Sequence, residues 1–174
     1  NALEALGYEC DATYPMYFYN EQLFPYHPSQ ENWTEQGSLN LIEIIQFADM
    51  GMESKDDYGR EKDQWPLYRT QSTAEFIPHI ESFMSYLEKN DQSQKPIVLC
   101  FYFHPWEFWE MPEGVIHYGE GGVLPDKFLI KGCGEYCLNQ VELLIDWLKS
   151  KEAVFLTAGQ CARKWQGILA QPDL

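Results

Sequence analysis

Residues 97–103 read Ile-Val-Leu-Cys-Phe-Tyr-Phe, an unbroken apolar run that follows Pro96 and ends at His104-Pro105. The run has no polar residue at alternate positions, so both faces of an extended chain would be apolar. That pattern is typical of a strand that is covered on both sides, as in a parallel sheet. We therefore expect a strand here that is covered on both faces.

Around this run, strand-like and helix-like segments alternate along the chain. Apolar residues recur with the helical period over Gln71–Asn90, Glu135–Lys151 and Gln160–Leu169, which predicts three amphipathic helices. Pro78 indicates that the first begins close to it. The expected inward residues of the other two helices are Leu138, Val141, Leu144, Ile145 and Leu148, then Ala162, Trp165 and Leu169.

Further strands are expected at Tyr8–Tyr14, Leu39–Ala48 and Ala153–Thr157, where short apolar or β-branched runs occur. The intervening segments, rich in polar residues, Gly or Pro, predict loops at Met16–Gly37, Asp49–Tyr68 and Met111–Gly134. Strand and helix in alternation predict an α/β fold with a parallel sheet, whose chemistry gathers at the carboxyl ends of the strands.

The chain opens on a short apolar stripe, Ala2, Leu3 and Leu6, which Gly7 follows. This resembles the last turn of a helix and its glycine cap. A domain rarely begins with the end of a helix, so we expect the chain to be part of a larger domain. We expect no membrane span, because no run of about 18 apolar residues occurs.

The net charge is −15, which disfavours nucleic acids and anionic membranes as partners. Aromatic residues make up 16% of the chain, enough for a core and for exposed rings that could stack on sugars. The five cysteines are an odd number. Cys133 and Cys137 could form a bridge or a metal pair, but without a second pair or a neighbouring His we favour two structural thiols.

His104 is the first polar residue after the expected strand at 97–103, and Pro105 restricts its main chain. A histidine at a strand end can donate or accept a proton near neutral pH. Trp106 and Trp109 lie beside it in sequence and could exclude water or stack on a sugar ring. The alternative is a histidine that only binds loop backbone.

The stretch V-L-C-F-Y-F-H-P-W-E-F (98–108) resembles the YFHPWE element of NodB-homology polysaccharide deacetylases. L-G-Y-E-C-D-A-T-Y-P (6–15), L-N-L-I-E-I-I-Q-F-A (39–48) and D-W-L-K-S-K-E-A-V-F-L-T (146–157) are similar to further segments of that family, in the same order. The resemblance covers most of the chain. It implies that residues 1–174 are the C-terminal portion of one deacetylase domain, part of a distorted (β/α) barrel.

In that family the His of the element is the general acid, a role that falls here on His104. Tyr102 replaces the usual Leu that packs on the substrate acetyl group. The resemblance places Asp11 near the active site, where it would pair with an Arg that precedes this chain. Glu107 could orient the second ring nitrogen of His104. Glu43 lies in a buried strand, so it needs a substrate contact or a structural salt bridge.

The resemblance also implies a divalent metal, commonly zinc, held by an Asp and two His of T-F-D-D and H-x-x-x-H motifs that do not occur here. We therefore expect the metal in the complete domain and its ligands outside this chain. The implied partners are an acetylated polysaccharide and either the N-terminal half of the domain or a complementing chain, which would cover an unpaired sheet edge. The implied activity is deacetylation at the cell envelope or outside the cell. The alternative is a non-catalytic carbohydrate-binding module.

Overall fold

The computed structural model of the chain describes residues 2–19, 22–53, 67–91 and 95–170. The chain forms two compact units. Unit 1 comprises residues 1–63, 82–101 and 154–174, and unit 2 comprises residues 64–81 and 102–153.

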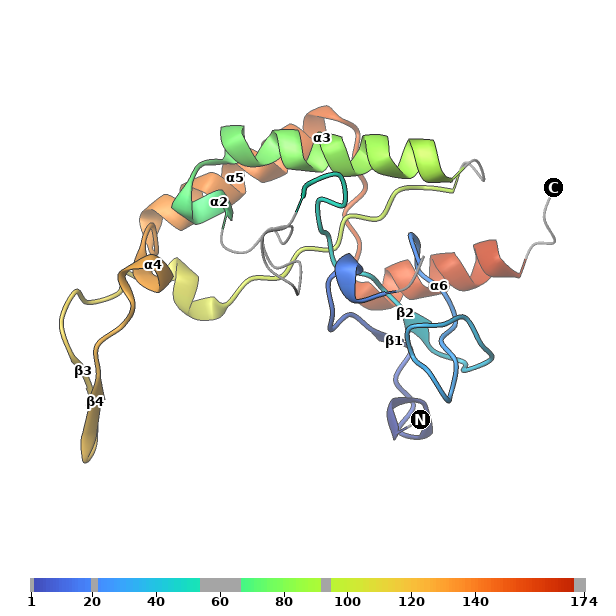
Figure 1. The fold of residues 1–174 in the computed structure, drawn as a ribbon, viewed down its shortest axis with the longest axis horizontal. Helices are drawn as coiled ribbons and strands as arrows, with labels where there is room; N and C mark the ends of the chain where they lie inside the picture. Colours follow the sequence, from blue (N-terminus) through green and yellow to red (C-terminus); the bar gives the residue numbers. More distant parts are fainter. Residues whose placement is uncertain (1, 20–21, 54–66, 92–94, 171–174) are drawn as a thin grey trace. The chain divides into compact units, whose positions relative to one another are not determined.

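Unit 1 is built on two short parallel strands, β1 (Cys10–Asp11) and β2 (Ile42–Glu43), in which Cys10 faces Ile42 and Asp11 faces Glu43. Main-chain hydrogen bonds extend the pairing as far as the amide of Gln46, which donates to Tyr14 at 3.2 Å. Helix α6 (Ala158–Leu169) packs on both strands (Figure 1). These elements enclose a small core whose fully buried members are Ile42, Ile44, Ala162 and Trp165.

Two further short elements in unit 1 agree with the sequence. Helix α1 (Ala2–Ala5) is followed by Gly7 at φ +79°, a left-handed conformation that glycine adopts without steric cost. The expected segment Leu39–Ala48 is buried at every position except Asn40, although only two of its residues form a strand. The expected loop from Met16 contains one turn of 3-10 helix, η1 (Met16–Phe18).

Two predicted strands are wrong. Residues 97–103 and 153–157 are not strands in the structure. The main-chain oxygen of Cys100 accepts a hydrogen bond from Phe47 at 2.8 Å. Val154 and Phe155 are 71% and 54% exposed. An apolar composition favours an extended chain, whereas a strand also needs a regular ladder of hydrogen bonds to a neighbour, which composition does not reveal.

Both runs line an open apolar hollow of about 560 Å³ in unit 1. Cys100 and Leu156 contribute to its wall from the two runs, and Trp165 and Ile168 contribute from α6. The described residues form two two-stranded sheets and no closed barrel. The partial barrel that the resemblance implies remains a prediction.

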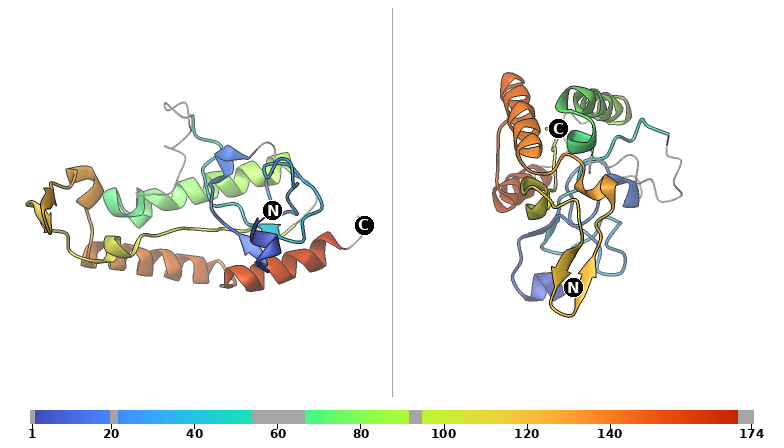
Figure 2. Two further views of the ribbon diagram at one scale, coloured as in Figure 1. Left: turned by 90° about the horizontal axis from the view of Figure 1, so that it is seen from below. Right: turned by 90° about the vertical axis from the view of Figure 1, so that its left-hand side faces the viewer.

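Unit 2 is mainly helical. Its elements are α2 (Leu67–Thr70), the start of α3 (Thr73–Asn90), η3 (Pro105–Phe108), β3 (Ile116–Tyr118), β4 (Gly121–Val123), α4 (Lys127–Ile130) and α5 (Glu135–Ser150). Helix α5 packs against α2 and η3. Strands β3 and β4 form an antiparallel hairpin (Figure 2), which corrects the prediction of a loop throughout Met111–Gly134. Gly119, at φ +64°, lies in its turn.

The three predicted helices exist, with two corrections. Helix α3 begins at Thr73 and includes Pro78, because the side-chain oxygen of Gln140 accepts from the Thr73 amide at 2.6 Å and so caps the helix start. On α5 the buried residues are Cys137, Gln140, Leu144 and Leu148. The inward position predicted for Leu138 is therefore wrong, since this side chain is 47% exposed. On α6, Ala162 and Trp165 are buried as expected.

The expected loop Asp49–Tyr68 lies mostly outside the described residues. Among the helices that the structure describes, none combines the length and the apolar character that a membrane crossing requires.

Candidate functional site

His104 lies at the junction between the apolar run 97–103 and η3. Its main chain is extended, with φ −93° and ψ 135°, and Pro105 is the first residue of the 3-10 turn. The side chain is half-buried. The sequence dictates this geometry, because a proline confines the preceding residue to extended conformations and is favoured at the first position of a helical turn.

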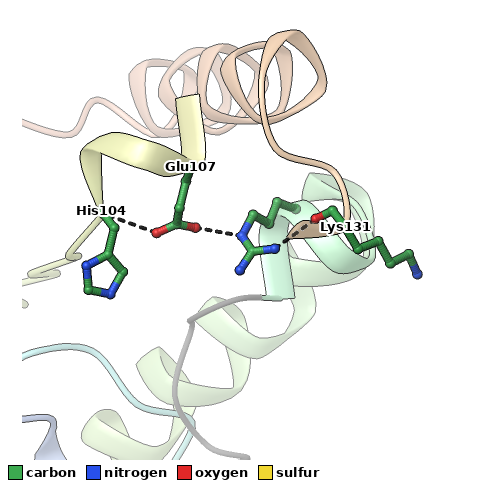
Figure 3. Close-up of polar contacts among 4 residues, drawn as sticks. His104, Glu107 and Lys131 are labelled. Carbon is green, nitrogen blue, oxygen red and sulfur yellow. Dashed lines mark hydrogen bonds and ion pairs between the residues drawn. The ribbon is translucent and has the colours of Figure 1, made fainter. Parts of the chain in front are cut away.

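A buried carboxylate fixes the main chain of His104. Glu107 is 0% exposed, and its Oε1 accepts a hydrogen bond from the His104 amide at 2.8 Å. Its Oε2 accepts from Nε of Arg69 at 2.7 Å, and a second guanidinium nitrogen of Arg69 donates to the main-chain oxygen of Lys131 at 2.8 Å. Figure 3 shows this chain of contacts, with the imidazole of His104 extending away from the carboxylate.

Two aromatic rings flank the imidazole of His104. The ring of Trp106 stacks on it, with centroids 5.4 Å apart and planes inclined by 15°. Tyr102 presents its ring edge-to-face to the imidazole at 5.7 Å. The Arg69 guanidinium lies 5.3 Å from the centroid of Trp106, a cation–π contact. His104 is therefore held through its main chain and flanked by rings on its side chain.

Unit 2 thus brings together four of the residues singled out from the sequence, His104, Tyr102, Trp106 and Glu107. Glu107 contacts the main-chain amide of His104, whereas the sequence interpretation gave it the ring nitrogen. Trp109, also singled out, follows η3 and is 73% exposed.

Arg69 was not singled out from the sequence. It lies 38 positions from Glu107, at the end of a charged segment interpreted as a loop, and no local pattern marks it. A fully buried carboxylate does imply a cationic partner, so the burial of Glu107 would have been the signal to search for one.

The other two candidates, Asp11 and Glu43, are register partners in the β1–β2 sheet of unit 1. Glu43 is 3% exposed, and its Oε1 accepts a hydrogen bond from the Tyr19 hydroxyl at 2.5 Å. Burial raises the pKa of Glu43 to about 7; the Tyr19 hydrogen bond opposes the shift, and the neighbouring charge of Asp11 adds to it. Glu43 is thus a carboxyl group poised to titrate near neutrality, but it is enclosed.

Asp11 is half-buried, and its carboxylate accepts hydrogen bonds from neighbouring residues of the chain. Its Oδ1 accepts from the Ala12 amide at 2.8 Å and from the Thr13 hydroxyl at 2.6 Å. These contacts stabilise the turn at the carboxyl end of β1. The pairing with an Arg that the resemblance implied concerns a residue outside this chain and stays a prediction.

Within residues 2–19, 22–53, 67–91 and 95–170, no group of three His, Cys, Asp or Glu side chains could hold a metal ion. The zinc that the resemblance implies, with its ligands outside this chain, stays a prediction. None of the five cysteines forms a disulfide bond in the described structure, with Cys137 buried and the other four half-buried, so the bridge considered between Cys133 and Cys137 is absent.

Comparisons of the chain with protein-family models, with curated proteins and with solved structures found no match.

Proposed function

We propose that this chain contributes the general acid of a polysaccharide deacetylase site, with His104 as the group that protonates the leaving amine. The observation that carries the proposal is the positioning of His104. A fully buried carboxylate holds its main chain, and Trp106 and Tyr102 flank its half-exposed ring. The resemblance of residues 98–108 to the YFHPWE element supports the same role.

The surroundings of His104 suit proton donation. Neutral and protonated imidazole interconvert near neutral pH, so a histidine can deliver a proton to an amine as the C–N bond breaks. The flanking rings limit the rotation of the imidazole and leave less room for water beside it, which preserves its alignment with a bound sugar. Glu107 and Arg69 act as positioning residues, because they contact the main chain of His104 and the ring of Trp106.

In this proposal the residues that activate water on the acetyl carbonyl come from outside the described part of the chain. The described residues alone are expected to release no acetate. The complete natural gene product, or this chain together with a complementing one, is the species to assay.

The test is acetate release from hexa-N-acetylchitohexaose by the complete gene product with zinc present. We expect His104→Ala to lower kcat by about 10²- to 10⁴-fold, the usual contribution of a positioned acid or base, without changing zinc content or Tm. His117→Ala is the matched control, because His117 is an exposed histidine of strand β3 in the same unit. Equal rates for His104→Ala and wild type would overturn the proposal.

A carbohydrate-binding module without catalysis is the second candidate. The 73% exposure of Trp109, beside the ring cluster around His104, favours it. In that case the complete gene product binds chitohexaose and releases no acetate, and Trp109→Ala weakens binding.

A further inference from the structure

A group of exposed aromatic rings lies in unit 1, at the carboxyl end of β1. Tyr14, Phe18 and Trp33 are 42%, 42% and 39% exposed. Tyr14 stacks on Trp33 with centroids 4.9 Å apart and planes inclined by 25°, and Phe18 packs against Tyr14 at 5.4 Å. We call these three rings the aromatic platform.

Buried tyrosines hold the platform in place. Tyr19 sets its ring edge against Trp33 at 5.2 Å and is itself fixed by its hydrogen bond to Glu43. The hydroxyl of Tyr26, which is 2% exposed, donates to the main-chain oxygen of Trp33 at 2.6 Å. Because the core fixes these rings before any ligand arrives, binding would lose little conformational entropy.

Single exposed aromatic residues are common and need no explanation. This group differs in two respects. Its rings pack on one another at the surface, and two of them carry polar tips. The Tyr14 hydroxyl and the Trp33 indole N–H form no side-chain hydrogen bond with any described residue, so both can bond to a ligand. The exposed hydroxyl of Thr13 lies next to Tyr14 in the chain.

The size and charge of the platform restrict the ligand. Three aromatic side chains at about 40% exposure present on the order of 250 Å², since each buries about 150–250 Å² when covered. A stable protein interface needs about 800 Å² per partner, whereas this area matches one or two sugar rings. The net charge of −15 disfavours an anionic ligand.

We propose that the aromatic platform is a binding site for the pyranose rings of a neutral oligosaccharide. The C–H face of a sugar would lie on the exposed rings of the platform, and its hydroxyls would bond to the tips of Tyr14 and Trp33. The residues of this binding site differ from those of the site in which His104 is proposed to act as the general acid. Only the choice of an N-acetylated probe rests on that proposed function.

The test is calorimetric titration of the chain with hexa-N-acetylchitohexaose and, separately, with cellohexaose. We expect binding of at least one of them, weakened about three- to tenfold by Tyr14→Ala and by Phe18→Ala, a loss typical of one aromatic contact. Tyr118→Ala is the matched control, because Tyr118 is a 64% exposed tyrosine of the β3–β4 hairpin.

Circular dichroism tests whether each variant is folded. If Tyr14→Ala is unfolded, the binding of Phe18→Ala decides the result. Binding of cellohexaose alone would support the platform and count against an N-acetylated substrate. The inference is overturned if neither oligosaccharide binds, or if the platform variants bind as Tyr118→Ala does. A dimer that Phe18→Ala dissociates would also overturn it, in favour of a protein partner.

Discussion

Arg69 and Glu107 form a fully buried ion pair: Nε donates to Oε2 at 2.7 Å, and neither side chain has any exposed surface. The pair joins α2 to η3, and the same carboxylate holds the amide of His104. Each of these buried charges stabilises the other, because burying an unpaired charge costs far more free energy than burying a pair. The geometry of the candidate site therefore depends on a contact between segments distant in sequence.

Removal of one partner should destabilise the chain strongly. Glu107→Leu leaves the Arg69 guanidinium buried without its carboxylate and the His104 amide without its acceptor. We expect a loss of about 3–5 kcal/mol in the free energy of unfolding, measured by urea denaturation. Replacing both residues, Arg69→Met with Glu107→Leu, should recover much of this loss.

The control for this prediction is the exposed pair Lys149–Asp146, at 3.4 Å with side chains 62% and 74% exposed. Asp146→Ala should change stability by less than about 1 kcal/mol. If Glu107→Leu were as mild as Asp146→Ala, the ion pair would not be buried in solution.

Gly132 lies against the main chain of Arg69 and should not tolerate a side chain. Its φ is +71°, and a Cβ atom there would lie 2.1 Å from the main-chain oxygen of Arg69. The left-handed conformation alone costs a non-glycine residue about 1–2 kcal/mol, and the clash adds to it. We expect Gly132→Ala to lower Tm by several degrees in a thermal scan.

Gly114→Ala is the control, since nothing lies within 4 Å of its added Cβ and its φ is not positive. It should leave Tm unchanged within about a degree. Equal Tm values for the two variants would contradict the close approach of Gly132 to Arg69.

The three long helices were predicted from the sequence, and β1 and β2 lie within two of the predicted strands, but the strands predicted at 97–103 and 153–157 are wrong, for physical reasons. A helix satisfies its hydrogen bonds locally, so the apolar spacing over Gln71–Asn90 and Gln160–Leu169 was sufficient to find α3 and α6. A strand needs a partner, and the apolar run 97–103 carries no information about whether one is present. The same limit explains Gln140, which is buried on α5 because it caps α3 through Thr73.

The candidate site shows the same division. The local order His104-Pro105-Trp106-Glu107 predicted a histidine with a fixed main chain beside an aromatic ring, and the structure has this arrangement. Arg69 was missed, because its role arises from a contact 38 positions away.

Glu43 should make stability depend on pH. The pKa of its carboxyl group is about 7 in the folded chain, whereas the ordinary pKa of a glutamate is about 4.5. Below pH 4.5 the carboxyl is protonated in both states. Between pH 4.5 and 7 the unfolded state releases the proton first, so stability falls as pH rises. By pH 8 the loss is complete, at up to about 3 kcal/mol.

Glu43→Gln removes this titration. The difference in unfolding free energy between pH 5 and pH 8 should therefore be smaller in Glu43→Gln than in wild type, measured by urea denaturation at each pH. Tyr19→Phe removes the hydrogen bond that lowers the pKa of Glu43, so its loss between the two pH values should be larger than in wild type. The same difference in all three proteins would contradict the buried environment of Glu43.

The cysteines should differ in their rates of alkylation. Only the thiolate reacts, and burial raises the pKa of the Cys100 thiol to about 11. At pH 8 about one molecule in a thousand then carries the thiolate, and the rate should rise about tenfold per pH unit up to pH 10. Cys137, which is 0% exposed, should react only after unfolding. Timed iodoacetamide labelling with peptide mass spectrometry measures both sites, and all five cysteines should label together in guanidinium chloride. Labelling of Cys137 in the native chain at the rate of the half-buried Cys133 would contradict its position on the inner face of α5.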